Sequence, residues 1–321
     1  MASFQETVNE FEVFLSKQHF PASPKTLYEP CEYLLQLGGK RIRPAMCLMS
    51  TDLFSSKNED SFFAAMAIEI FHNFTLVHDD IMDKAPTRRG QKTVHEKYNL
   101  PVAILSGDVL CIMAYQFLNK IKHHAKDEII ALFNKTAIEI CEGQQLDMDF
   151  ETIETLSKSD YLNMIRLKTA VLLACSMKIG ALLGNANEKD AQLMYEIGED
   201  IGLAFQVKDD YLDAFGETIK TGKQQGGDIL ANKKTILVAE AFELANEEEK
   251  IQLHKLQFEN ENSKVEKTLQ FFKKLGVDQR VIDLKNNYTN QAFKKLEELN
   301  IDFESKKYLI ELTQLLLDRE S

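Results

Sequence analysis

The sequence predicts an all-α protein. In residues 62–78, FFAAMAIEIFHNFTLVH, apolar side chains recur at three- and four-residue steps and nearly encircle the segment, as in a buried helix. The 321 residues include only 14 Gly and 6 Pro, and alternating strand patterns joined by hairpin turns are absent. We therefore predict one all-α domain over residues 1–321, with a few long buried helices wrapped by others.

Helical patterns continue along the chain at residues 102–122, 128–146, 159–184, 189–215, 233–246 and 305–318. Short turn-forming stretches separate them: PASP at 21–24, GG at 38–39, APTRRG at 85–90, NLP at 99–101 and TGKQQGG at 221–227. None is long enough for an interdomain linker. Residues 245–300 are richer in Lys, Glu and Asn, which predicts peripheral helices with solvated faces.

Composition and charge exclude several classes of protein. The net charge of −12 argues against general nucleic-acid binding, which needs a basic face, and means that an anionic ligand must be held by local cations or metal ions. The five cysteines show no C-x-x-C spacing and lie in apolar patterns, which predicts buried free thiols in a reducing compartment. The acidic N-terminus is unlike a secretory signal, and no uninterrupted apolar span reaches about 18 residues. We predict a cytoplasmic protein without stable membrane insertion.

A pattern of three aspartates occurs twice. DDIMD at 79–83 and DDYLD at 209–213 each close an apolar helix, and positions i and i+4 share a helix face. Carboxylates that leave room for water and phosphate oxygens are typical of Mg²⁺ sites. One such motif alone is more often a solvated helix end. Two copies favour a shared cavity in which Mg²⁺ ions bridge six carboxylates to a diphosphate.

Cationic side chains accompany both aspartate motifs. Two arginines follow the first motif with forked donors that suit phosphate oxygens. Others lie in GGKRIRP at 38–44, where the glycines allow a close backbone approach, in the apolar segment RLKTAVLLACSM, and after the second motif. Each alone is most simply a surface charge; together they predict an anion site. The residues are Arg88, Arg89, Lys40, Arg41, Arg43, Lys168 and Lys223.

The ordered motifs resemble those of the trans-isoprenyl diphosphate synthases, or polyprenyl synthetases. The resemblance runs from about residue 30 to about 240 and rests on GGKRIRP, HNFTLVHDDIMDKAPTRRG, EGQQLD, KTA, FQVKDDYLD and TGKQQGGDI. It implies a homodimer whose helices surround a deep central cavity, as in the isoprenoid synthase type of fold. It also implies a reaction that needs Mg²⁺, about three ions per active site: an allylic diphosphate ionises, isopentenyl diphosphate attacks the cation, and a proton leaves.

The resemblance also implies a role for individual residues. The metal ligands are Asp79, Asp80, Asp83 and Asp209, supported by Asp210 and Asp213. Contacts to the allylic diphosphate fall to Arg88, Lys168, Lys223 and Lys233. The isopentenyl diphosphate site comprises Lys40, Arg43, His72 and Arg89. The groups that place dipoles beside the carbocation are Thr169 and Gln206, and the residues that support the cationic side chains are Gln144 and Asp147.

His72 shows how a structural and a functional interpretation compete. A lone histidine on an apolar helix is more often a core residue, although His72 shares a helix face with Asp79, two turns later. The family position alone favours the functional interpretation. His78, His95 and Asp108 have no such support and are expected to be structural.

Product length is predicted from the helix that ends in the first motif. Phe74 and Thr75 lie five and four residues before Asp79. An aromatic residue at the fifth position only resembles enzymes that stop at geranylgeranyl diphosphate, C20, with farnesyl diphosphate, C15, as the next choice. Phe71 and Ile70, a turn deeper, are further candidates for the floor of the channel. The alternative is that Phe74 is ordinary core and that other helices or the dimer partner set the floor.

Two rival functions are weighed against this one. Terpene cyclases share the fold and the first motif, but DDYLD and GGKRIRP point away from cyclisation. A non-catalytic partner subunit of a synthase typically lacks one aspartate motif, whereas both are complete here.

Overall fold

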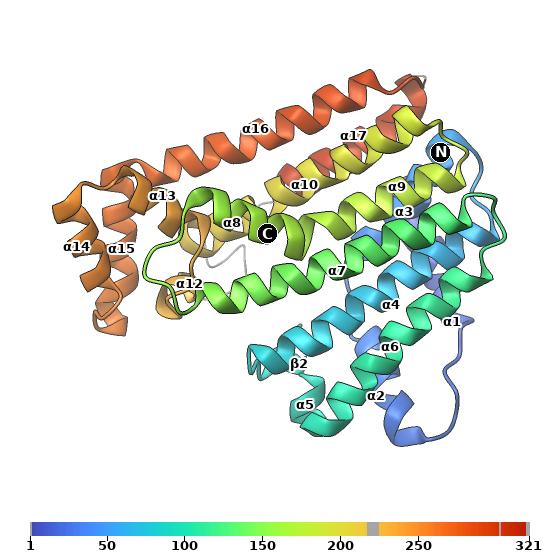
Figure 1. Cartoon of the computed structure of the whole chain (residues 1–321), viewed down its shortest axis with the longest axis horizontal. Coiled ribbons are helices and arrows are strands. Elements are labelled where there is room, and N and C mark those ends of the chain that lie inside the picture. Colours follow the sequence, from blue (N-terminus) through green and yellow to red (C-terminus); the bar gives the residue numbers. More distant parts are fainter. Residues whose placement is uncertain (1, 217–224, 302, 319–321) are drawn as a thin grey trace. The chain divides into compact units, whose positions relative to one another are not determined.

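The computed structural model describes residues 2–216, 225–301 and 303–318 (Figure 1). Of the residues that the structure describes, 78% are helical, so the all-α prediction is confirmed. Two compact units can be distinguished. The first comprises Met1–Asn134, Cys175–Met194 and Asn300–Leu309, and the second comprises Lys135–Ala174, Tyr195–Leu299 and Ile310–Ser321. The single domain predicted for residues 1–321 stays a prediction.

The first unit contains most of the N-terminal helices. They are α1 (Phe4–Ser16), α2 (Lys25–Gln36), α3 (Ile42–Phe54), α4 (Glu59–Met82), α5 (Val94–Lys97) and α6 (Leu100–Lys120). The two-residue strands β1 (Thr87–Arg88) and β2 (Gln91–Lys92) form an antiparallel hairpin in which Arg88 pairs with Gln91. Four helices have residues in both units: α7 (Lys126–Phe150), α9 (Val171–Leu183), α10 (Glu188–Phe215) and α17 (Phe303–Asp318).

Helix α4 carries the first aspartate motif and confirms the helix predicted for residues 62–78. Asn58 and Ser61 form a capping box at its N-terminus, which satisfies backbone N–H groups that the helix leaves unpaired. Helix α6 runs alongside α4 (Figure 1). Gly107 allows a close approach there, because a Cβ atom at this position would lie 2.2 Å from Nε2 of His78. The motif therefore ends a helix that is firmly packed along its length.

The second unit contains the remaining elements. They are α8 (Lys158–Ile165), the π-helical turn η1 (Arg166–Ala170), α12 (Gly227–Leu230), α13 (Ile236–Leu244), α14 (Glu247–Leu256), α15 (Glu261–Leu275) and α16 (Val277–Glu298). Its core includes the fully buried Val207, Ile236 and Phe272. The helices with solvated faces predicted for residues 245–300 are present as α14, α15 and α16.

Two details differ from the predictions. The single helix expected over residues 159–184 is interrupted by η1. This π-helical turn is wider than an α-helical turn, and the apolar periodicity does not reveal it. The cysteines form no disulfide among the described residues, but Cys141 is exposed and Cys111 is only partly buried, so the prediction that all are buried is wrong at these two positions. Cys141 lies on the solvent side of α7, where the apolar pattern is not strict enough to assign a face.

Helix α6 is the one described helix whose length and composition would allow it to cross a membrane. Its sequence includes the exposed Asp108, so no uninterrupted apolar run reaches the length of a membrane span. One third of its most apolar window is buried in the structure. Its large exposed apolar side chains are Leu100, Ile104, Leu105 and Ile112. This helix therefore presents an apolar face that the described chain leaves uncovered.

Candidate active site

The first aspartate motif divides its carboxylates by environment. Asp83 caps α4 and is exposed, Asp79 is half-buried, and Asp80 is only 1% exposed. Both oxygens of Asp80 accept hydrogen bonds from Arg88, at 2.8 Å from Nε and 2.7 Å from Nη2. The β1–β2 hairpin brings Arg88 back to the helix end. Asp80, predicted as a metal ligand, and Arg88, predicted as a diphosphate contact, are thus bound to each other.

Several residues predicted for isopentenyl diphosphate come together around His72. Nη1 of Arg43 lies 3.2 Å from Nε2 of His72. Burial, followed by the positive charges of Arg43 and Arg89, holds the pKa of His72 well below its usual range, so the imidazole is neutral and accepts from Arg43. Burial lowers the pKa of Arg43 to about 10, although the charge of Glu69 opposes the shift. The result is a compact cationic cluster.

Arg89 joins this cluster through an unusual backbone. Its φ is +52°, in the left-handed region, and its guanidinium lies against Gly39. A Cβ atom on Gly39 would be 2.9 Å from Nη2 of Arg89, so only glycine fits. Burial lowers the pKa of Arg89. Lys40, the next residue after Gly39, is exposed. The glycines of GGKRIRP therefore make room for a cation of the chain itself.

Arg41 has a structural role that the sequence analysis did not assign. It is buried and donates to Glu69 at 2.5 Å, to Glu12 at 2.6 Å and to the carbonyl of Leu35 at 2.8 Å. These bonds fix the N-terminus of α3, from whose first turn Arg43 reaches His72. Glu69 was the sequence feature that could have predicted this role of Arg41. A carboxylate within AAMAIEIF needs a partner when that helix is buried.

The second motif shows the same division. Asp209 is exposed, whereas Asp210 is buried on α10. Asp210 accepts from the hydroxyl of Tyr161, from the backbone N–H of Ile236 at 3.2 Å and from Nε2 of Gln206 at 3.0 Å. Burial raises the pKa of Asp210 to about 7, because the three donors offset the loss of solvation only in part. Its carboxylate is fully engaged by the protein.

Asp213 fixes the segment that follows the motif. Its carboxylate accepts from the backbone N–H of Asp228 at 3.0 Å, and its carbonyl accepts from Gly226 at 2.7 Å. These bonds hold the start of α12. Lys233, three residues after this helix, has its ammonium 3.6 Å from the carboxylate of Asp228. Lys223 lies outside the described residues.

The π-helical turn η1 carries Lys168 and Thr169. Nζ of Lys168 donates to Asp147 at 2.6 Å, and Oγ1 of Thr169 donates to Oε1 of Gln206 at 3.3 Å. Four of the predicted residues are therefore in contact pairwise. Gln144, on α7, is 7% exposed, and its amide has no hydrogen-bond partner among the described residues. Single π-helical turns frequently mark functional sites.

The donor chemistry of the motifs suits Mg²⁺. Among the described residues, no group of three His, Cys, Asp or Glu side chains is already arranged around a metal position. Each motif nevertheless leaves exposed a carboxylate, Asp83 in the first and Asp209 in the second, and carboxylate oxygens are the ligands that Mg²⁺ prefers. The buried Nε of Arg43 also has no hydrogen-bond partner in the described part of the chain, as expected beside an anion position.

The two residues predicted to set product length lie one turn before the motif. The ring of Phe74 packs 5.2 Å from that of Phe71 and 4.9 Å from the imidazole of His78. The hydroxyl of Thr75 donates to the carbonyl of His72 at 2.8 Å. Both side chains are half-buried. Phe74 is thus held in one position by two aromatic neighbours.

Comparison with known proteins decides the family. The family model described as polyprenyl synthetase matches residues 24–275. The chain belongs to the polyprenyl synthetase family. It is a trans-prenyltransferase. The resemblance based on its motifs is confirmed.

Individual relatives cover nearly the whole of this prenyltransferase. It is 39% identical over 320 residues to geranylgeranyl diphosphate synthase of Sulfolobus acidocaldarius, with 97% of this chain and 96% of the relative covered. A crystal structure of a geranylgeranyl pyrophosphate synthase superposes with a TM-score of 0.94 at 41% identity, covering both chains fully. Geranylfarnesyl diphosphate synthase of Natronomonas pharaonis is 37% identical over 259 residues, 75% of each chain.

Proposed function

We propose that the protein condenses isopentenyl diphosphate with an allylic diphosphate to give all-trans geranylgeranyl diphosphate. The observation that carries this proposal is the cationic cluster of Arg43, His72 and Arg89, in which two guanidinium groups lie beside a neutral imidazole. A cyclase acts on one diphosphate, whereas a condensation needs a second diphosphate site. A neutral His72 beside two arginines suits such an anion without adding a further charge.

The allylic diphosphate would be bound at the aspartate motifs. Mg²⁺, about three ions per site, would be held there by Asp79, Asp83 and Asp209 and would supply Lewis-acid stabilisation of the departing diphosphate. Asp80 belongs to this set only if an ion shares its oxygens with Arg88. We assign contacts with the diphosphate oxygens to Arg88, Lys168, Lys223 and Lys233, as forked or point-charge donors.

The reaction has three bond changes. The C–O bond of the allylic diphosphate breaks, and its electron pair leaves with the diphosphate. The double bond of isopentenyl diphosphate then forms the new C–C bond with the allylic cation. The resulting cation loses a proton to the released diphosphate. Thr169 and Gln206, hydrogen-bonded to each other, present oxygen dipoles for the cationic stages, and Asp147 binds Lys168. We assign Gln144, on the same helix as Asp147, to the support of the cationic side chains.

Product length is assigned to Phe74, with Thr75 too small to block the chain. The packing of Phe74 against Phe71 and His78 supports this choice, since a large packed ring can close a channel. The names of two relatives point to geranylgeranyl diphosphate, and a third is a geranylfarnesyl diphosphate synthase. Farnesyl diphosphate remains the second candidate product.

A homodimer in the cytoplasm completes the proposal. The apolar face of α6 includes Leu105 and Ile112, which are 58% and 60% exposed. Contiguous apolar surface of this kind is typical of protein–protein interfaces. A second copy of the chain would cover it, as the family resemblance implies.

The proposed function is tested by product analysis. The purified protein is incubated with isopentenyl diphosphate and, in turn, dimethylallyl, geranyl and farnesyl diphosphate, with Mg²⁺ or with a chelator. We expect C20 products that disappear with the chelator and in Asp209→Asn, but persist in Asp283→Asn, which changes an exposed carboxylate on α16. Cyclic hydrocarbons, or no condensation with any starter, would contradict the proposal.

A further inference from the structure

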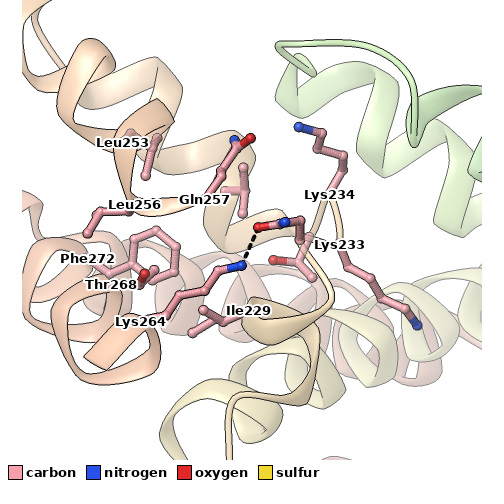
Figure 2. A pocket seen from close by; sticks show the side chains of 12 residues that line it. Ile229, Lys233, Lys234, Leu253, Leu256, Gln257, Lys264, Thr268 and Phe272 are labelled. Carbon is pink, nitrogen blue, oxygen red and sulfur yellow. Dashed lines mark hydrogen bonds between the residues drawn. The ribbon is translucent and has the colours of Figure 1, made fainter. Parts of the chain in front are cut away.

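Lys264, on α15, is buried in a small cavity of the second unit. Its side chain is 5% exposed, and the cavity beside it measures about 40 Å³ (Figure 2). Nζ donates to Oδ1 of Asn232 at 2.7 Å and to the carbonyl of Leu230 at 3.3 Å. None of the described residues that line the cavity carries a carboxylate. Lys264 therefore keeps its ammonium inside the protein with neutral acceptors.

Burying this ammonium costs free energy, so the contacts that it makes need an explanation. An ammonium loses much solvation on burial and offers three N–H donors, two of which are used here. The neighbouring side chains of Leu253, Leu256 and Phe272 are apolar and offer it no acceptor. The ammonium instead forms hydrogen bonds to the turn at Leu230 and Asn232. Asn232 has a φ of +55°, so this turn adopts a left-handed conformation that needs support.

The turn that Lys264 binds is followed directly by a residue of the proposed diphosphate site. Lys233 follows Asn232, and its backbone N–H donates to the carbonyl of Asp228 at 2.9 Å. The same segment is tied to the second motif at both ends: the N–H of Asp228 donates to Asp213, and the N–H of Ile236 donates to Asp210. Lys264, on α15, binds the middle of this segment at Leu230 and Asn232. Figure 2 shows the side chain of Lys233 directed away from that of Lys264.

We propose that Lys264 is a positioning residue of the allylic diphosphate site. Through Asn232 it sets the turn that presents Lys233, and it does not touch the substrate itself. This inference rests on the proposed function, in which Lys233 contacts the allylic diphosphate. It predicts that the affinity for the allylic substrate depends on Lys264, whereas the affinity for isopentenyl diphosphate does not.

Steady-state kinetics of four variants test the inference. Lys264→Met keeps the length of the side chain without its charge. Asn232→Gly tolerates the left-handed turn but removes the acceptor, and Asn232→Asp restores an acceptor. Lys267→Met is the matched control, because Lys267 lies one turn along α15 with its side chain 49% exposed. We expect about a tenfold rise in the allylic KM for Lys264→Met and Asn232→Gly, with the KM for isopentenyl diphosphate unchanged. Asn232→Asp should lower the allylic KM again relative to Asn232→Gly.

The outcomes separate this inference from the proposed function. An allylic KM that stays at the wild-type value in Asn232→Gly overturns the positioning role, even if Lys264→Met fails to fold. Equal rises in both KM values also overturn it, because they indicate a general loss of structure. Lys233→Ala is measured alongside: an unchanged allylic KM in that variant refutes the contact assigned to Lys233. Absence of condensation by the wild-type enzyme refutes the function.

Discussion

Arg88 binds Asp80 through two parallel hydrogen bonds, and this pair explains why the first motif does not use its carboxylates alike. Asp210, the corresponding second aspartate of the other motif, is also buried, with Tyr161, Gln206 and the backbone of Ile236 as donors. In both motifs the second carboxylate is engaged by the protein. Asp79, Asp83 and Asp209 remain closer to solvent, where an ion can reach them, whereas the carboxylate of Asp213 accepts from the N–H of Asp228.

This asymmetry predicts different effects for neighbouring aspartates. Asp80→Ala leaves Arg88 without its partner and should lower the free energy of unfolding by about 1–3 kcal/mol. Asp83→Asn changes an exposed carboxylate and should leave stability within about 0.5 kcal/mol of the wild type while raising the Mg²⁺ concentration needed for half-maximal activity. Urea unfolding and Mg²⁺ titrations measure the two effects. Equal destabilisation by both substitutions would contradict the division.

His72 predicts a pH dependence of stability. Its pKa in the folded protein is below the unfolded value of about 6.5, so the unfolded chain binds more protons in the window below pH 6.5. Stability from the neutral imidazole is therefore complete above pH 6.5 and is lost as the pH falls toward the folded pKa, by up to about 1.4 kcal/mol per pH unit. The groups that act on it are Arg41, Arg43, Arg88 and Arg89, with Glu69 opposite in charge.

His72→Gln should flatten this part of the profile. Unfolding free energies at intervals from pH 7 to pH 5 measure it, and His124→Gln is the control at another site. A profile that is equally steep in wild type and His72→Gln would show that the protonation of His72 is not responsible.

Tyr161→Phe removes one donor from the buried carboxylate of Asp210. Because an unsatisfied buried acceptor costs more than the hydrogen bond itself, we expect a loss of about 1–3 kcal/mol in the free energy of unfolding. Tyr211→Phe is the control, since the Tyr211 ring packs on Phe215 and keeps that packing in the variant. Thermal and urea unfolding compare the two. Equal stability of Tyr161→Phe and the wild type would mean that Asp210 does not depend on this hydroxyl.

Phe74→Ala should lengthen the product. The substitution removes a ring that Phe71 and His78 hold in place, and the space gained would admit about one more five-carbon unit. Product chains are measured after reaction with farnesyl diphosphate as starter. Phe258→Ala changes a ring that is 87% exposed and serves as control. The same product distribution in all three proteins would remove Phe74 from the proposal.

Ile112→Glu tests the proposed dimer. A charge in the middle of the apolar face of α6 should weaken association strongly, because a buried unpaired carboxylate is unfavourable. Sedimentation velocity measures the mass of wild type and variant, with Ile251→Glu, another exposed position, as control. A wild-type monomer would refute the dimer, and a variant that stays dimeric would place the interface elsewhere.

Helical periodicity and short motifs were readable without the structure, because both depend on residues close together in the chain. The buried helix at 62–78 lies within α4, and the residue pairs Lys168 with Asp147 and Thr169 with Gln206 join positions that the resemblance had already named. Arg41 was not separable from Arg43 in GGKRIRP, since the two arginines lie two residues apart in one short motif. Their difference lies in Glu12 and Glu69, on other helices.

The sequence by itself determined that this protein is all-α, since helical periodicity is a local property of the chain, and its motifs already resembled those of the trans-prenyltransferases. Only the tertiary structure decided which carboxylate of each motif is buried and that Lys168 lies on a π-helical turn. It also decided that Lys264 donates a hydrogen bond to the turn before Lys233. The physical reason is that burial and hydrogen-bond partners come from distant segments: Tyr161 and Asp210 are 49 residues apart. No local pattern encodes that contact.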